Sequence, residues 1–141
     1  MSLAQTALAV VVDAALGVWL GSMLFFSFVG APTVFDVLGD DAGRVVNAIF
    51  PKYYVFGVAL GAIAGLGAVA AGLSAGFDSN RLGVLALAGI GAANAAYARW
   101  VLVPKMDRAG EDAFAQYHKQ SVALNGLTML AVGGALVLSH L

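Results

Sequence analysis

The first residue that could do chemistry is an aspartate inside a long apolar run. Asp13 lies between apolar residues on both sides, and Gly17 and Gly21 follow it at intervals of four. An ionisable group inside a bilayer costs at least about 2.5–3.5 kcal/mol on insertion scales, so its presence needs a reason. On a helix this spacing puts the carboxyl on a small-residue face turned toward other helices. Asp13 is either part of a functional polar site or a protonated or hydrogen-bonded carboxyl near the outer membrane boundary.

A second polar group lies near the C-terminus. His118, Ser121 and Asn125 are spaced i, i+3 and i+7, which places them on one stripe of a helix. Such a stripe can hold a polar ligand, pass a proton, or tie two helices together by hydrogen bonds worth about 0.6–2 kcal/mol each. The plainer interpretations are a hydrated interfacial histidine and an asparagine that links helices. The preceding apolar segment supplies the side chains expected to face this stripe: Asn94, Tyr97 and Arg99.

A tryptophan near the middle of the first apolar run is also unusual. Trp19 is far from the interfaces that tryptophan prefers, and its indole N–H needs an acceptor. Either it packs against glycines or it lies beside a polar or π-rich ligand. Glycines repeat every four residues in the second run, at Gly57, Gly61 and Gly65. This spacing allows close helix packing within the chain, and it also suits homo-oligomerisation or a glycine-lined pathway.

The spacing of possible ligand residues disfavours three cofactors. The two histidines, His118 and His140, would lie about 33 Å apart along one helix at about 1.5 Å per residue, so they cannot both bind one haem in a monomer. Retinal needs a buried lysine, but every lysine is expected at the inner membrane boundary. Copper is unlikely because three internal methionines and one histidine make a thin ligand set without thiolates. We predict no metal site and no catalytic residue, and the cofactor is unknown.

The composition is that of a membrane protein. Of the 141 residues, 61% are hydrophobic and 11% are charged, whereas soluble domains have about 45–50% apolar and about 25% charged residues. The formal net charge of −1 leaves no basic face for nucleic acid, and the absence of cysteine excludes disulfides and thiolate sites. No basic region precedes the first apolar run, so we expect it to remain as a membrane helix.

The charge-free runs predict an all-α, single-domain integral membrane protein. Four helices are expected over about 8–30, 53–73, 82–103 and 117–138, each long enough to cross about 30 Å of hydrocarbon. They would form a four-helix bundle. A short amphipathic helix over about 41–50 is expected to lie on the inner surface between the first two, with Asp40 or Asp41 as its cap and Pro51 ending it.

The basic residues predict the orientation of the chain. Six of the seven lie in the two longer connections or at their edges, and only Arg81 lies in the remaining one. Cytoplasmic loops carry the excess of lysine and arginine, so both termini are predicted outside the cell membrane.

Four ordered motifs carry a family resemblance. Residues 18–32 (VWLGSMLFFSFVGAP), 50–54 (FPKYY), 103–106 (VPKM) and 117–125 (YHKQSVALN) resemble the transmembrane protein 205-like family, small membrane proteins of unknown function. The resemblance implies a four-helix membrane bundle and singles out Pro32, Pro51, Tyr54, Pro104, His118, Ser121 and Asn125. The first helix is also distantly similar to copper-resistance D-type membrane domains. Asp13 stands where those domains commonly carry a histidine, which weakens any inference of haem or copper.

Two functions remain open at this stage. The first is a non-enzymatic membrane protein that binds or moves a small polar solute, ion or proton through a polar site between its helices. The alternative is an accessory or assembly subunit that packs against a larger membrane complex through glycine-rich helix faces. An enzyme is disfavoured because no nucleophile and base, phosphate loop or metal set occurs at a known spacing.

Overall fold

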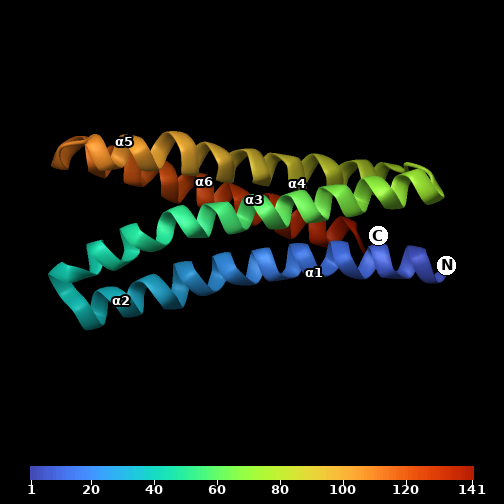
Figure 1. The fold of residues 1–141 in the computed structure, drawn as a ribbon, viewed down its shortest axis with the longest axis horizontal. Helices are drawn as coiled ribbons and strands as arrows, with labels where there is room; N and C mark the ends of the chain where they lie inside the picture. Colours follow the sequence, from blue (N-terminus) through green and yellow to red (C-terminus); the bar gives the residue numbers. More distant parts are fainter.

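The chain folds into four long helices with short extensions. The computed structural model describes the backbone of residues 1–141 and all side chains except those of Glu111 and Asp112. The long helices are α1 (Leu3–Phe25), α3 (Ala42–Ala75), α4 (Ser79–Tyr97) and α6 (Glu111–Leu138). Two short helices, α2 (Ala31–Leu38) and α5 (Val103–Arg108), prolong α1 and α4 (Figure 1). The predicted all-α class is confirmed.

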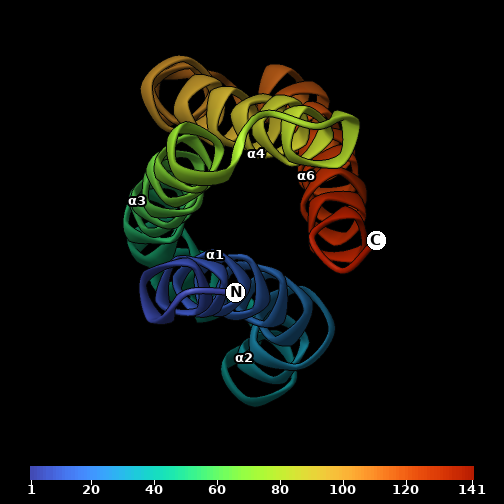
Figure 2. The same ribbon diagram turned by 90° about the vertical axis from the view of Figure 1, so that its right-hand side faces the viewer.

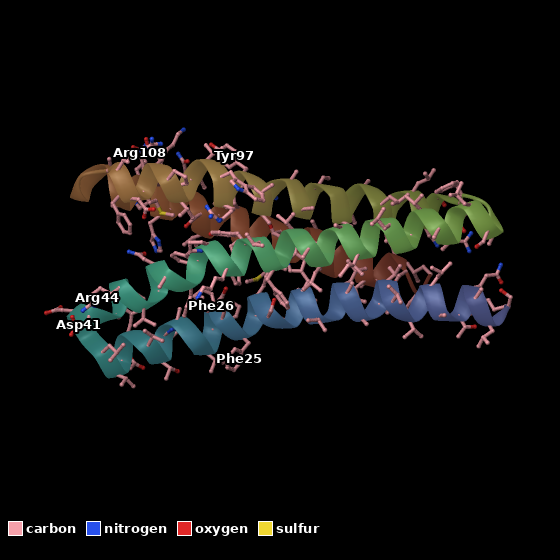
Figure 3. All side chains as sticks on the ribbon, in the orientation of Figure 1. Phe25, Phe26, Asp41, Arg44, Tyr97 and Arg108 are labelled. Carbon is pink, nitrogen blue, oxygen red and sulfur yellow. The ribbon has the colours of Figure 1, made fainter. Side chains whose placement is uncertain are left out.

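The long helices pack as neighbours around an open ring. α1 contacts α3, α3 contacts α4, and α6 contacts both α4 and α1. Viewed along the helices, the ring is least closed between α6 and the arm formed by α1 and α2 (Figure 2). Both termini and the α3–α4 turn lie at one end, here called the terminal end. The α2–α3 and α5–α6 connections lie at the other, the basic end, together with Arg44 and Arg108 (Figure 3).

The helical stretches have the length and composition of membrane spans. Three are long and apolar enough to cross a bilayer: Leu3–Ala75, Ser79–Arg108 and Ala113–Leu138. The first contains both α1 and α3, and the chain reverses within it at the 3-10 turn Gly39–Asp41. Large apolar side chains such as Leu66, Leu73 and Leu130 are exposed on the outside of the molecule. A surface of this kind suits lipid as its solvent.

The predicted interfacial helix over 41–50 is wrong as a separate element. α3 runs without interruption from Ala42 to Ala75 and includes Pro51. The rings of Phe50 and Tyr54 stack at 6.0 Å across the proline, one helical turn apart, and this contact favours helix on both sides of it. Asp41 occupies the N-cap position without a side-chain hydrogen bond. The residues expected to lie on the membrane surface therefore continue into the long helix.

The other two prolines follow turns of π-helix. The segment Phe26–Gly30 precedes Pro32 and joins α1 to α2, while Ala98–Leu102 precedes Pro104 and joins α4 to α5. Proline lacks an N–H, and its ring crowds the carbonyl four residues earlier. A wider turn absorbs this conflict without ending the helix. Each arm therefore continues past its proline to the basic end.

The core is apolar and centres on one aromatic side chain. The largest side chains that are almost fully buried are Trp19, Leu16, Met23, Leu102 and Val132. They come from α1, α6 and the π-helical turn after α4. Alanines and glycines fill much of the remaining core, which lets the helices approach closely.

Candidate ligand-binding site

A large pocket opens at the basic end between the α1–α2 arm, α3 and α6. Its volume is about 620 Å³, within the range of about 300–1,000 Å³ typical of small-molecule sites. We call it the aromatic pocket because seven aromatic rings line it: Phe26, Phe28, Phe35, Phe50, Tyr53, Tyr54 and Phe114. Phe26 lies 5.0 Å from Tyr53 and 5.9 Å from Phe50 between ring centroids, so these three rings form a continuous part of the wall.

Part of the lining of the aromatic pocket is exposed on the surface of the molecule. Phe28 and Phe35 on the α1–α2 arm are 71% and 51% exposed, and Val122 on α6 is 58% exposed. Each of them also lines the pocket. They lie on the α1–α2 arm and on α6, the two elements between which the ring of helices is least closed (Figure 2). A molecule dissolved in the bilayer could enter there without crossing the aqueous surface.

Polar side chains from three elements meet at the inner end of the pocket. The Tyr53 hydroxyl donates to Oδ1 of Asn125 at 2.6 Å, and Nδ2 of Asn125 donates to Oγ of Ser27 at 2.9 Å. Asn125 therefore joins α6 to α3 and to the π-helical turn after α1. We call this set, Ser27, Tyr53 and Asn125, the asparagine junction.

The predicted stripe on α6 faces the same pocket. Ser121 is buried, and its hydroxyl donates to the His118 carbonyl at 2.8 Å. The buried Tyr54 lines the pocket with Ser121. His118 is exposed at the outer part of the pocket, where its imidazole stacks on Phe114 at 6.1 Å. The structure thus brings His118, Ser121 and Asn125 together along one wall.

A much smaller cavity lies on the other side of the junction. It has a volume of about 10 Å³ and is lined by Trp19, Asn94, Asn125 and Thr128 among others. A cavity needs about 10–15 Å³ to hold one water molecule, so this one has room for about one. Asn94 therefore lies near Asn125, as the sequence predicts.

Trp19 is enclosed by glycines of two helices. A Cβ atom built on Gly57 would lie 2.8 Å from the indole nitrogen, and one built on Gly61 or Gly91 would lie 3.0 or 2.9 Å from the ring. Real Cβ contacts are longer than this, so the ring occupies the space that side chains at these positions would need. Its position in mid-span is explained by this packing.

Three of the expected packing glycines lie elsewhere. A Cβ at Gly17, Gly21 or Gly65 would meet no atom within 4 Å among the described residues, so their expected role in close helix packing is wrong within this chain. The backbone there approaches no other helix closely enough to require a glycine.

Asp13 is not part of the aromatic pocket. It lies at the terminal end, where the Ser139 hydroxyl donates to one carboxylate oxygen at 2.8 Å and Nε2 of His140 is 3.5 Å from the other. A separate cavity of about 280 Å³ adjoins it. The nearly fully buried side chains of Leu16 and Val132 lie between this end and the junction. The polar residues thus form two groups rather than one continuous site.

Tyr97 and Arg99 also lie outside the pocket. The Tyr97 side chain is 43% exposed on the outer surface (Figure 3). The Arg99 guanidinium lies 6.0 Å from the Trp100 ring, and its Nε is buried without a hydrogen-bond partner among the described atoms. Neither residue faces the stripe on α6. Arg99 lies in the π-helical turn after α4, and the wider winding of this turn rotates its side chains relative to those of a regular α-helix.

Sequence reasoning missed part of the junction. Neither Ser27 nor Tyr53 was among the residues expected to form a polar site, and Tyr54 was indicated only by the family resemblance. The available signal for Ser27 is a lone hydroxyl between phenylalanines in an apolar run. For the tyrosines, the signal is a pair of hydroxyls directly after Lys52, the last basic residue of α3.

The comparisons with known proteins identify the family. Residues 14–115 match the family described as domain of unknown function (DUF4149). The chain belongs to the DUF4149 family. It is also 33% identical over 130 residues to an uncharacterized protein of Aquifex aeolicus (strain VF5), covering 89% of this chain and 92% of that protein. No solved structure matches this DUF4149 chain.

The family match supports only part of the expected resemblance. A family of unknown function is shown, but neither the transmembrane protein 205-like name nor the copper-resistance name comes from the comparisons. The matched segment includes Trp19, Ser27 and Tyr53 and ends before the polar stripe on α6. Among the side chains that the structure describes, no three His, Cys, Asp or Glu residues are grouped so that they could hold a metal ion.

Proposed function

We propose that this DUF4149 protein is a non-enzymatic membrane protein that binds a small, mostly apolar molecule from the bilayer in its aromatic pocket. The observation that carries the proposal is a cavity of about 620 Å³ with an aromatic wall, a hydrogen-bonding inner end and a mouth on the lipid-facing side. Ligand sites in proteins combine these features, a largely apolar lining and a few convergent polar groups.

The proposed topology has four passes, formed by the arms α1–α2, α3, α4–α5 and α6. The basic end would face the cytoplasm, and both termini would lie outside. Arg44 and Arg108 lie at the same end of the molecule, which supports this orientation (Figure 3). The aromatic pocket would then open in the inner half of the bilayer.

Two expectations from the sequence stay predictions. They are the resemblance to the transmembrane protein 205-like family and the absence of haem, retinal and copper.

Binding is better supported than passage of a polar solute through the protein. A route would have to join Asp13 at the terminal end to His118 and Asn125 at the basic end. Leu16 and Val132 are almost fully buried between these groups and leave an apolar barrier. The lining of the aromatic pocket also favours an apolar molecule over an ion or a small polar solute.

Filling the pocket tests the proposal. Gly126 lines the pocket and has open space around it, so Gly126→Leu would occupy ligand volume without a clash in the empty protein. Gly89 is exposed, lies outside the pocket and is equally open, so Gly89→Leu is the matched control. Mass spectrometry of extracts from the purified proteins should show a co-purifying molecule in wild type and Gly89→Leu that is depleted in Gly126→Leu. Equal content in all three would refute binding in this pocket.

A second candidate is an accessory subunit that packs on another membrane helix. Gly17 and Gly21 favour it, because they are four residues apart and have open space beside them. Such a pair lets a partner helix or a second copy approach closely. Gly21→Leu should then release a partner or dissociate a homo-oligomer in mild detergent, whereas Gly126→Leu should not. An unchanged assembly in Gly21→Leu would count against this function.

A further inference from the structure

We propose that the ligand of the aromatic pocket is an uncharged lipid that places a hydroxyl or carbonyl oxygen at the asparagine junction. This inference rests on the proposed function and names the ligand class. It depends on three properties of the pocket: the charge of its lining, the depth of its polar end and the hydrogen-bond donors left there.

The described lining of the pocket contains no carboxylate, ammonium or guanidinium group. Its polar members are Ser27, Asn47, Tyr53, Tyr54, His118, Ser121 and Asn125, and it includes no aspartate, glutamate, lysine or arginine among the residues whose side chains are described. A charged head group at the asparagine junction would therefore find no carboxylate, ammonium or guanidinium counter-ion there. An uncharged one needs only hydrogen bonds, which the polar members can supply.

The polar end is deep rather than at the membrane surface. Asn125 follows Lys119, the last basic residue of α6, by six positions, which corresponds to about 9 Å along a helix at about 1.5 Å per residue. The opposite part of the pocket is lined by Phe35, Gly43 and Phe114, each a few residues from a connection at the basic end. A charge placed at the deep end would be far from water and costly. The ligand's polar group at this end is therefore expected to be neutral.

The junction retains an unused donor. The amide of Asn125 has two N–H groups, and Ser27 takes one of them. The second N–H is not used in the side-chain bonds that join the described residues. The Tyr54 hydroxyl lies nearby in the same lining. These donors favour an acceptor oxygen, such as that of an alcohol, ketone or ester, and the aromatic wall suits the hydrocarbon attached to it.

Three probes with one chain length test the inference: hexadecan-1-ol, hexadecyl sulfate and hexadecyltrimethylammonium. The two charged probes keep their charge at any usable pH. Binding to the full-length protein in mild detergent is measured by native mass spectrometry. We expect the alcohol to bind at least about tenfold more tightly than either charged probe, and Gly126→Leu to abolish its saturable binding.

Variants at the junction separate the polar contact from general packing. Asn125→Leu should reduce the preference for the alcohol about tenfold, and the milder Ser27→Ala should reduce it less. Gln120→Leu is the control, because Gln120 is exposed on α6 outside the pocket. This variant should leave the preference for the alcohol unchanged. Circular dichroism checks that each variant remains helical.

The outcomes distinguish the two proposals. If all three probes bind equally well and Gly126→Leu blocks them, the pocket binds lipid but the assignment of an uncharged ligand is wrong. The same conclusion follows if Asn125→Leu and Ser27→Ala keep the full preference for the alcohol. If no probe binds saturably and no molecule co-purifies with the protein, the proposed function itself fails.

Discussion

Adding one methyl group against Trp19 should destabilise the protein, while the same change one turn away should stabilise it. At Gly61 a new Cβ would lie 2.9 Å from the Cβ of Ala92 and 3.0 Å from the indole ring, whereas at Gly65 it would meet no described atom within 4 Å. Replacing glycine by alanine within a helix gains about 1 kcal/mol at either site. Overpacking at Gly61 costs about 1–3 kcal/mol.

The gain in helix propensity is the same at Gly61 and Gly65. The difference in the free energy of unfolding between the two alanine variants therefore measures the clash at Gly61. We expect Gly61→Ala to be about 1–3 kcal/mol less stable than Gly65→Ala. Unfolding in mixed micelles with increasing sodium dodecyl sulfate, followed by circular dichroism, provides the measurement. Adding Trp19→Phe to Gly61→Ala should make the alanine less harmful, because the smaller ring leaves room. Equal stability of the two alanine variants would refute the packing of Trp19 described here.

Three further changes test other contacts. Tyr53→Phe removes the hydrogen bond to Asn125 and should lower the free energy of unfolding in the same assay by about 0.6–1.7 kcal/mol; no loss would mean that the bond contributes nothing. Ser139→Ala removes the exposed hydrogen bond at the terminal end and should cost no more than about 1.5 kcal/mol, so a larger loss would contradict its exposed position. Because the chain has no cysteine, Asp40→Cys and Ser139→Cys can be labelled singly with an impermeant maleimide in intact cells. Only Ser139→Cys should react, and the reverse pattern would invert the proposed topology.

The helical class followed from the sequence because charges are excluded from long runs, and helices satisfy their own backbone in lipid. The sequence did not predict whether each helix would end at its proline or continue past it. Pro51 remains inside α3, where a ring contact between Phe50 and Tyr54 bridges it. Pro32 and Pro104 are accommodated by wider turns. Such outcomes depend on neighbouring side chains and on small changes in winding, neither of which leaves a periodic signal.

The part of the site that lies on a single helix was predictable from the sequence. His118, Ser121 and Asn125 share one helix, so their spacing alone places them on one wall. Their partners are distant in the chain: Tyr53 is 72 positions from Asn125, and Ser27 is 98. Spacing within one helix does not say which face of another helix it meets. For this reason Tyr97 was expected at the stripe, although it is exposed on the outer surface.

The position of the pocket follows from how α6 is joined to the α1–α2 arm. Among the described side chains, two hydrogen bonds link them, Ser139 to Asp13 at the terminal end and Asn125 to Ser27 at the junction. These points are about 21 Å apart along α6 at about 1.5 Å per residue. Beyond Ser27 toward the basic end, the arm and α6 border the pocket mouth. A ligand oxygen that accepts from the second N–H of the Asn125 amide leaves the bond from Asn125 to Ser27 in place. Both links should therefore hold when a ligand binds, and the mouth can widen only beyond Ser27, toward the basic end.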